Sequence, residues 1–317
     1  MLFFLNNQLK QNYYVPLQVN TIIEMKNILL VILIITCNNI FAQQDSIAPQ
    51  QETPKQVNYT HVALVGTIIP ITIAGVYIYL NNVWWKEQRV PFHITDDLEL
   101  RYALNLDKAG HFISSYFVSE IFSDVLQVTG LPKKQSVWGG AALSIINSTI
   151  VEVKDAYSPY WGFSKFDMLA NISGALLPVL QYHIQAIKYL HFSWSYDFSH
   201  PSYYKSLPGH EDKSFIDDYE RHNFWCTYDI WNALRLQNKE SYTPFFIQPA
   251  VGLSAQNLDG KGAGEHEWFI GMHINLMNLY RGSSKFIQYT CKYINFYHLP
   301  APAIKIQPEI TAYPITY

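Results

Sequence analysis

The sequence predicts a mainly helical protein of α+β class: a membrane-associated bundle of about four helices followed by a small C-terminal antiparallel β-sheet. Two observations support this fold class. Long stretches with few charges, separated by short segments rich in Gly, Pro and Ser, fill residues 59–195 and are typical of bundle helices. From residue 243 onward, apolar and polar residues alternate in several places, which is the period of a half-buried strand.

Composition excludes several classes of protein. The chain has 317 residues, of which 49% are hydrophobic, 15% aromatic and 15% charged, so it can bury a substantial core and is not disordered. The formal net charge of -3 provides no basic field for a phosphate backbone, which excludes a nucleic-acid binder. The many Tyr and Trp side chains suit a protein that lies partly in a membrane interface.

Residues 25–42 read as a secretory signal peptide. Lys26 supplies a positive start, residues 28–35 form an unbroken apolar run, and Ala42 precedes a polar stretch. This order is typical of an export signal that is cleaved after the small residue. The alternative is an uncleaved membrane anchor, although the apolar run is short compared with the roughly 20 residues of a full span.

The segments around this signal have no expected fold. Residues 1–24 resemble an over-extended start, and residues 43–58, rich in Gln, Pro, Ser and Thr, predict a disordered tether. Cys37 follows Thr36, where a lipoprotein signal has a smaller residue. The sequence therefore predicts an exported protein of the periplasm or cell envelope without deciding between the inner and the outer membrane.

Removal of the signal leaves Cys226 and Cys291. Two cysteines are too few for a disulfide framework and have no metal-type spacing. They either form one bridge or are two free thiols.

Four helices are expected in the bundle, and their approximate ranges are 62–80, 105–128, 135–156 and 165–190. The first contains no charged residue and ends near Trp84 and Trp85, as a membrane-spanning helix with an aromatic end would. A buried core helix is the alternative. The second is amphipathic, with Glu120 and Asp124 on its polar face.

The C-terminal part is expected to contain a linker and a sheet. Residues 196–242 predict a linker with a short helix near 217–236, and residues 243–317 an aromatic-rich β region with further strands from 286 onward. The glycine-rich segment 259–264 lies between two expected strands. It is therefore interpreted as a hairpin loop and not as a phosphate-binding loop, which would open a helix.

Ionisable residues lie on the helices where an apolar bundle should not tolerate them. Pairs with helical spacing each project from one face, and charged groups in apolar surroundings are stabilised by meeting one another. The resulting polar cluster is expected to contain Asp107, Lys108, His111, Glu152, Lys154, Asp155, Asp167 and Asn171.

At these residues the sequence resembles a known family. The motifs Asp107-Lys-Ala-Gly-His-Phe, Glu152-Val-Lys-Asp and Phe166-Asp-Met-Leu-Ala-Asn-Ile-Ser-Gly are similar to those of the YfiM-like bacterial envelope proteins, many described as predicted periplasmic lipoproteins containing a domain of unknown function. The order and spacing of these motif residues also resemble, more weakly, those of the VanZ family of small membrane proteins. Neither resemblance implies an established reaction.

The cluster has two interpretations. Asp107, His111, Glu152, Asp155 and Asp167 offer four carboxylates and one imidazole, a set that can hold a divalent metal. Alternatively the cluster is an ion-paired polar core, in which Lys108 and Lys154 neutralise carboxylates and Asn171 binds backbone near Gly174. The residue Asp167 has a further explanation, because Ser164 and Asp167 have the spacing of a helix capping box.

Other candidate sites are weaker. The segment 206–210 faintly resembles the histidine segment of lipid phosphatases, but it is expected to be a loop. The segment 265–267, Glu-His-Glu, lies at the head of an expected strand, where charges are commonly solvated.

The sequence therefore assigns no confident catalytic residue. The first hypothesis is a non-enzymatic envelope protein whose partners are the membrane or other envelope proteins. The alternative is a metal-dependent envelope enzyme that acts on a phosphorylated or lipid-linked substrate.

Overall fold

The computed structural model describes residues 58–316 except for residue 87, residue 281 and the segments 96–99, 199–202, 208–213 and 236–245. The expected signal peptide, the residues upstream of it, Cys37 and almost all of the expected tether lie outside the described residues.

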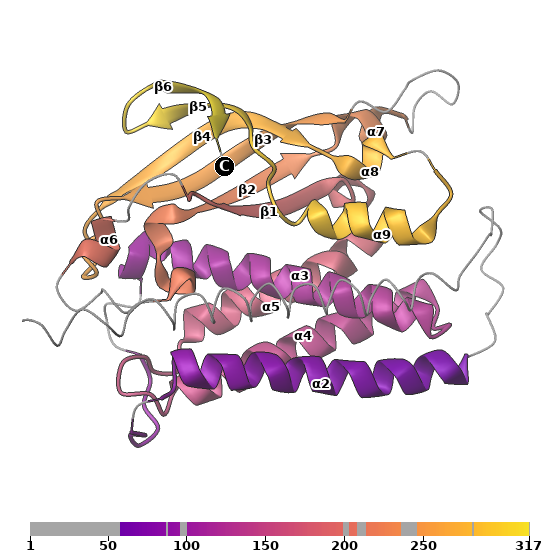
Figure 1. Cartoon of the computed structure of the whole chain (residues 1–317), viewed down its shortest axis with the longest axis horizontal. Helices are drawn as coiled ribbons and strands as arrows, with labels where there is room; N and C mark the ends of the chain where they lie inside the picture. The colour runs from indigo at the N-terminus through magenta and orange to yellow at the C-terminus, as the bar shows by residue number, and fades with distance from the viewer. Residues whose placement is uncertain are drawn as a thin grey trace, which may run out of the picture.

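The protein has two layers, with a helical bundle on one side and a β-sheet on the other (Figure 1). The bundle consists of α2 (Tyr59–Val83), α3 (Leu106–Val128), α4 (Lys133–Asp155) and α5 (Lys165–His183). A short 3-10 helix, η1 (Tyr102–Asn105), leads into α3. The α+β class and the four expected helices are confirmed.

The sheet contains six antiparallel strands in the sequence order β1-β2-β3-β4-β5-β6. Their bounds are β1 (Leu190–Tyr196), β2 (His222–Tyr228), β3 (Ile247–Gln256), β4 (Glu265–Ile274), β5 (Ala301–Gln307) and β6 (Thr311–Thr316). A short helix, η2 (Gln185–Ile187), precedes β1. Other short helices lie between the strands: α6 (Tyr203–Ser206), η3 (Phe215–Asp217), η4 (Tyr219–Arg221), α7 (Ile230–Arg235), α8 (Leu276–Leu279) and α9 (Lys285–Ile294). The glycine-rich segment joins β3 to β4 and is a hairpin loop, as expected.

The outer edge of β1 is also occupied. The Trp194 N–H donates to the Phe296 carbonyl at 2.9 Å, and the His298 N–H donates to the Trp194 carbonyl at 2.9 Å. Residues 296–298 precede β5, which lies on the other side of the sheet. This contact curls the sheet and protects an edge that would otherwise expose unpaired backbone groups.

Three expected boundaries are wrong. The last bundle helix ends at His183, and β1 begins at Leu190. A strand, β2, occupies the middle of the expected helix near 217–236, where short helices lie on either side of it, and α9 occupies part of the expected strand region after 286. Most residues of β2 are buried because Phe224 packs against α3 on one face of the sheet and Trp225 packs against Phe269 on the other. Its sequence therefore lacks the alternation that identifies a strand with one exposed face.

Helices α3, α4 and α5 approach closely through small residues. A Cβ placed on Gly174 of α5 would lie 2.0 Å from the Phe112 carbonyl oxygen of α3. One placed on Gly140 of α4 would lie 2.5 Å from the Ser119 carbonyl oxygen. The Ser119 hydroxyl donates to the Ala175 carbonyl at 2.8 Å. These contacts explain why apolar helices that contain Gly and Ser form a bundle without bulky side chains between them.

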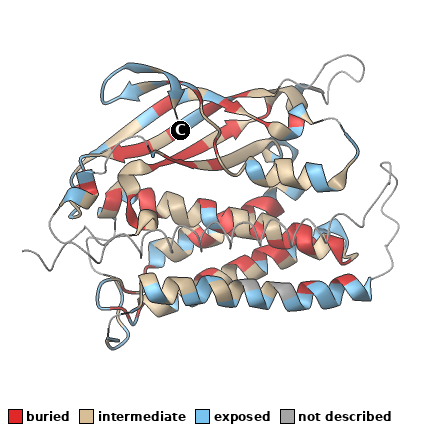
Figure 2. Cartoon of the chain, in the orientation of Figure 1, coloured by how far each residue is buried: buried red, intermediate tan, exposed pale blue. Residues whose placement is uncertain are grey.

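Helix α2 lies at the margin of the bundle (Figure 1), and much of its surface is exposed or intermediate (Figure 2). It is 25 residues long with a mean hydropathy of 2.0 over its most apolar window, and 6% of that window is buried. Helix α4, with a mean hydropathy of 1.2, is the other described helix that is long and apolar enough to cross a membrane. Of the two alternatives for residues 62–80, the buried core helix is therefore wrong.

Both remaining cysteines, Cys226 and Cys291, are free thiols. Of the two alternatives that the sequence leaves open, the pair of free thiols is confirmed.

We expect the substitution Gly174→Ala to lower the free energy of unfolding by about 1–3 kcal/mol, because the new methyl group overlaps the α3 backbone. Urea denaturation followed by circular dichroism measures this change. The matched control is Gly66→Ala in α2, where a Cβ meets nothing within 4 Å. The control should be neutral or stabilise by about 0.5–1 kcal/mol, and equal losses in the two variants would contradict the close approach.

Candidate functional site

The polar cluster forms where one end of each of three helices meets. Asp107, Lys108 and His111 lie in the first two turns of α3, Glu152 lies near the end of α4, and Asp167 lies in the first turn of α5. Because α4 runs antiparallel to both neighbours in the chain, its C-terminal end lies beside their N-terminal ends. The structure thus brings together residues that are up to 60 positions apart.

Lys108 lies between two carboxylates. Its Nζ is 2.8 Å from Asp107 Oδ2 and 2.7 Å from Asp167 Oδ1. The side chains of both partners are largely buried, so the ion pairs form in a region of reduced dielectric constant, where they are stronger than on the surface. The expectation that Lys108 neutralises carboxylates is confirmed.

His111 faces carboxylates on both sides of its ring. Its Nδ1 lies 3.7 Å from Glu152 Oε1, and its Nε2 lies 3.7 Å from Asp167 Oδ2. One donor atom from each of these three residues lies within 4.8 Å of the others. The imidazole and two carboxylates therefore form a candidate ligand set for a metal ion, on three different helices.

Asn171 joins the same helices through its carboxamide. Its Nδ2 donates to Glu152 Oε1 at 3.3 Å, and its Oδ1 accepts from the Ser115 hydroxyl at 2.8 Å and lies 3.3 Å from His111 Nδ1. The Ser164 N–H donates to the other oxygen of Glu152 at 3.4 Å. Asn171 therefore orients the side chains of the cluster. These contacts are with side chains, whereas the sequence predicted that Asn171 binds backbone near Gly174.

Two expected members of the cluster, Asp155 and Lys154, do not belong to the candidate ligand set of His111, Glu152 and Asp167. Asp155 Oδ1 accepts from Trp85 Nε1 at 2.6 Å. The Lys154 ammonium lies 5.1 Å from the centre of the Tyr77 ring and 5.2 Å from that of Trp85, so it makes cation–π contacts with the end of α2. The expectation that Lys154 neutralises a carboxylate is wrong, because its side chain points outward from α4 toward these rings.

The expected cap of α5 is present in part. The Ser164 hydroxyl accepts from the Asp167 N–H at 2.9 Å, as the N-cap residue of a helix does. The Asp167 carboxylate lies against Lys108 instead. Its position is therefore set by the charge of Lys108 as well as by the helix start.

Burial raises the pKa of several carboxyl groups in the cluster. The pKa of Glu152 rises to about 8, because burial disfavours its charge and Asp167 and Asp155 repel it. Burial raises the pKa of Asp155 to about 7 and that of Asp107 to about 6, the latter against the attraction of Lys108. Asp107 Oδ1 is buried without a hydrogen-bond partner. The described cluster thus holds more negative charge than its one paired lysine can balance.

The two weaker sites do not join this cluster. His266 lies 2.9 Å from the Leu104 carbonyl through its Nε2, and Glu267 Oε1 pairs with Lys305 Nζ at 2.8 Å. Glu265 accepts from Gln256 on the neighbouring strand at 3.0 Å. Ser206 ends the short helix α6, and the rest of segment 206–210 lies largely outside the described residues.

A second ionic group, which the sequence did not predict, joins α3 to α9. Lys292 Nζ lies 2.5 Å from Glu120 Oε2 and also pairs with Asp124. The spacing of Glu120 and Asp124 on one helical face was visible in the sequence. Their partner was not, because Lys292 belongs to α9, a helix within a region that resembles strands.

The comparisons with known proteins concern the region that carries the cluster. Residues 99–183 match a family model described as "Predicted periplasmic lipoprotein (DUF2279)". This match covers α3, α4 and α5 with all the clustered residues, and it supports the periplasm or cell envelope as the location. It supports a periplasmic lipoprotein family of unknown function but not the YfiM-like or VanZ families specifically. No curated protein and no solved structure matches the chain.

The raised pKa of Glu152 predicts how stability depends on pH without divalent cations. Folded Glu152 keeps its proton up to about pH 8, whereas the unfolded residue loses it near its ordinary pKa of 4.5. Between these values the folded state binds more protons, so the free energy of unfolding falls as pH rises. We expect Glu152→Gln to remove on the order of 3 kcal/mol of this fall.

Urea denaturation in EDTA between about pH 5 and pH 8 measures this dependence. The control is Glu265→Gln, which changes an exposed carboxyl group on β4 and should keep the wild-type slope. An unchanged slope in Glu152→Gln would show that this carboxyl group does not titrate in the interval.

Proposed function

We propose that this chain is a cell-envelope protein that binds a divalent cation in its helical bundle, through His111, Glu152 and Asp167. The observation that carries the proposal is the three donor atoms on three helices, all within 4.8 Å of one another. The bound cation would join α3, α4 and α5, and the protein would act on partners in the envelope without a reaction of its own.

The charge balance of the cluster supports a cation over an internal ionic core. An ionic core needs roughly equal numbers of positive and negative groups, since an unpaired buried charge is costly. Here Lys108 pairs with Asp107 and Asp167, and the pKa of Glu152 is raised to about 8. A divalent cation beside Glu152 and Asp167 would supply the missing positive charge and would displace the proton from Glu152.

The types of donor indicate which cations suit the site. An imidazole nitrogen with two carboxylates fits Zn²⁺ or Mn²⁺ better than Ca²⁺, which prefers oxygen ligands alone. Donor atoms bound to one such ion lie at most about 4.2 Å apart, twice a bond of roughly 2.1 Å. The three side chains would therefore move slightly toward one another, and Asn171 would hold Glu152 and His111 in place as an outer partner.

One observation favours a second candidate function. Three protein ligands leave a coordination position open, as in catalytic zinc sites, and the His111 side chain is 27% exposed. A substrate could therefore reach the cation. In this candidate the protein is an envelope enzyme that hydrolyses a phosphorylated or lipid-linked substrate with metal-activated water, and Lys108 meets the phosphate.

Metal binding is measured by isothermal titration of the purified, EDTA-treated protein with Zn²⁺ and with Mn²⁺. We expect one cation to bind per chain, and His111→Ala to weaken binding at least about tenfold, because one of three ligands is lost. The control is His183→Ala, at the exposed C-terminal end of α5, which should bind as the wild type does. Circular dichroism establishes that both variants are folded, and equal binding by both would contradict the proposed ligands.

We also propose that α2 associates the protein with a membrane. Its exposed side chains include Leu64, Ile71 and Ile78, which are 43%, 66% and 60% exposed. Trp84 and Trp85 lie at its end, where aromatic rings suit the membrane interface. An envelope protein has a membrane within reach, and burying these side chains in lipid would remove apolar surface from water.

The triple substitution of Leu64, Ile71 and Ile78 by Ser should lower binding to vesicles of phosphatidylethanolamine and phosphatidylglycerol several-fold, because about 25 cal/mol is lost per Å² of apolar surface that is no longer buried. Co-sedimentation of protein lacking residues 1–42 measures this change without the apolar export signal. The control replaces Leu234, Leu279 and Ile310, exposed apolar residues elsewhere, by Ser. Equal loss of binding in the two triple variants would argue against a specific role of α2.

A further inference from the structure

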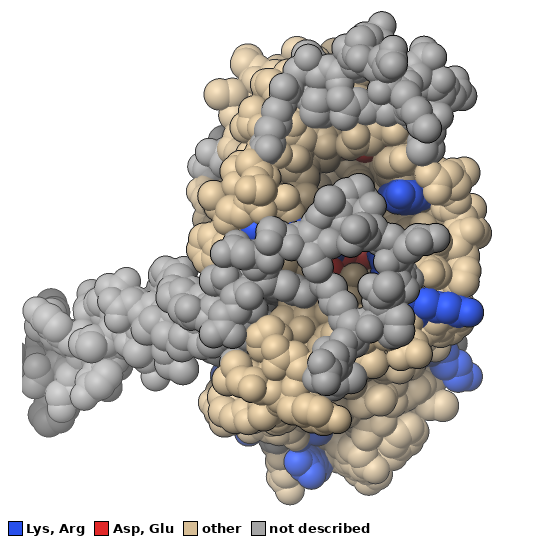
Figure 3. Space-filling view, turned by 90° about the vertical axis from the view of Figure 1, so that its right-hand side faces the viewer, with Lys and Arg blue, Asp and Glu red and all other residues tan. Residues whose placement is uncertain are grey.

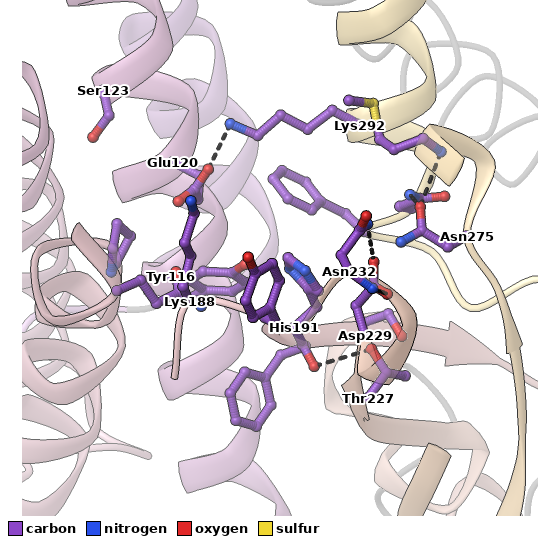
Figure 4. Close-up of a pocket in the computed structure, with 18 of the residues that line it drawn as sticks. Tyr116, Glu120, Ser123, Lys188, His191, Thr227, Asp229, Asn232, Asn275 and Lys292 are labelled. Atoms are coloured by element: carbon purple, nitrogen blue, oxygen red, sulfur yellow. Dashed lines mark hydrogen bonds and ion pairs between the residues drawn. The ribbon is translucent and has the colours of Figure 1, made fainter. Parts of the chain in front are cut away.

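A cavity of about 620 Å³ lies between the bundle and one end of the sheet. Its walls come from the bundle helices α3, α4 and α5, from the start of β1 and β3, from the end of β2 and β4, and from the short helices α7, α8 and α9. Figure 4 shows its lining side chains converging from these elements. The lining shares no residue with the His111 cluster, so the cavity is a separate feature of the fold.

The lining includes Asn232 of α7 and Met277 of α8, two helices that lie at the right-hand end of the molecule in Figure 1. Viewed from that end, the surface has a hollow in which acidic side chains are visible and near which basic side chains lie (Figure 3). The volume is within the range of roughly 300–1,000 Å³ that is usual for small-molecule sites.

The charges that line the cavity balance one another. The acidic residues are Glu120, Asp124 and Asp229, and the basic residues are Lys133, Lys188 and Lys292. Lys292 pairs with Glu120 and Asp124, and Asp229 accepts hydrogen bonds from the carboxamides of Asn232 and Asn278 at 2.6 and 2.8 Å. Such a lining has no excess charge with which to select an ionic ligand.

Most of the remaining lining residues are polar or aromatic. Carboxamides are frequent, among them Gln181, Gln185, Gln248 and Asn275, and the rings of Tyr116 and Phe192 also contribute. A carboxamide both donates and accepts hydrogen bonds. Aromatic rings in turn offer flat apolar faces with a large contact area.

Two buried polar side chains in the lining have no partner. Gln248 is 1% exposed, and neither its Nε2 nor its Oε1 has a hydrogen-bond partner. Ser193 is 2% exposed, and its Oγ also has none. An unsatisfied buried group costs about 1–3 kcal/mol, and folded proteins contain few of them. Both residues line the cavity, so a polar molecule that enters it would provide the missing hydrogen-bond partners.

We propose that this cavity binds an uncharged, polyhydroxylated ligand of the saccharide class. A hydroxyl group both donates and accepts hydrogen bonds. The hydroxyl groups of a sugar can therefore bond to the Nε2 and Oε1 of Gln248 and to the Oγ of Ser193. The flat apolar faces of a sugar ring match the aromatic rings of the lining. The balanced charges favour a neutral sugar over a charged one. This proposal does not depend on the divalent-cation site.

Isothermal titration of the folded protein with two neutral disaccharides, N,N′-diacetylchitobiose and maltose, tests this proposal, with glucose 6-phosphate as the charged probe. We expect saturable binding of at least one disaccharide and weaker binding of the sugar phosphate. Gln248→Ala should weaken disaccharide binding at least tenfold. The control is Gln256→Ala at the other end of the same strand, where the side chain is bonded to Glu265, and it should bind as the wild type does.

Absence of binding for both disaccharides would overturn the proposal and leave the cavity as one filled by water only. A preference for the sugar phosphate, or equal effects of the two Gln substitutions, would overturn it as well. If Gln248→Ala does not fold, Ser193→Ala provides the same comparison with a smaller change, because it removes only the unpartnered hydroxyl group.

Discussion

The close contact between the backbones of α3 and α5 at Gly174 is the constraint on which the site depends. Any side chain at this position would push the two helices apart. The contact places Asn171, one turn earlier on α5, within hydrogen-bond distance of Ser115 and near His111 on α3. The same carboxamide reaches Glu152 on α4. Small residues therefore set the helix spacing at which the polar side chains can meet.

The polar cluster combines this rigid frame with an imbalance of charge. Lys108 is held by two carboxylates, and Lys154 lies over aromatic rings of α2. Glu152 is left in a buried position in which its charge is unfavourable. The helices hold these carboxylates close together, and the cluster has too few positive groups to balance them. Such an arrangement is suited to binding a cation from solution, because the cation relieves the repulsion between the carboxylates.

The sheet forms one wall of the separate cavity. Its curl, completed by the contact between β1 and residues 296–298, leaves a polar end beside the bundle. Lys292 of α9 reaches across to Glu120 and Asp124 of α3 and ties the two layers together there. At the same end, Val125 and Val128 of α3 pack with Tyr289 and Tyr293 of α9, so polar and apolar contacts together hold the layers around the cavity.

Local patterns in the sequence were sufficient to predict the α+β class, the four bundle helices without the end of the last one, the β3–β4 hairpin and the grouping of Asp107, Lys108, His111, Glu152, Asp167 and Asn171. These features depend on local periodicity and on the spacing of residues along one helix. Three features were evident only in the tertiary structure. Lys154 contacts the rings of Tyr77 and Trp85 instead of a carboxylate of the cluster. His222–Tyr228 is a strand, and Lys292 forms an ionic group with Glu120 and Asp124 of α3. The reason is that each of these depends on partners distant in the chain, whose approach local patterns do not encode.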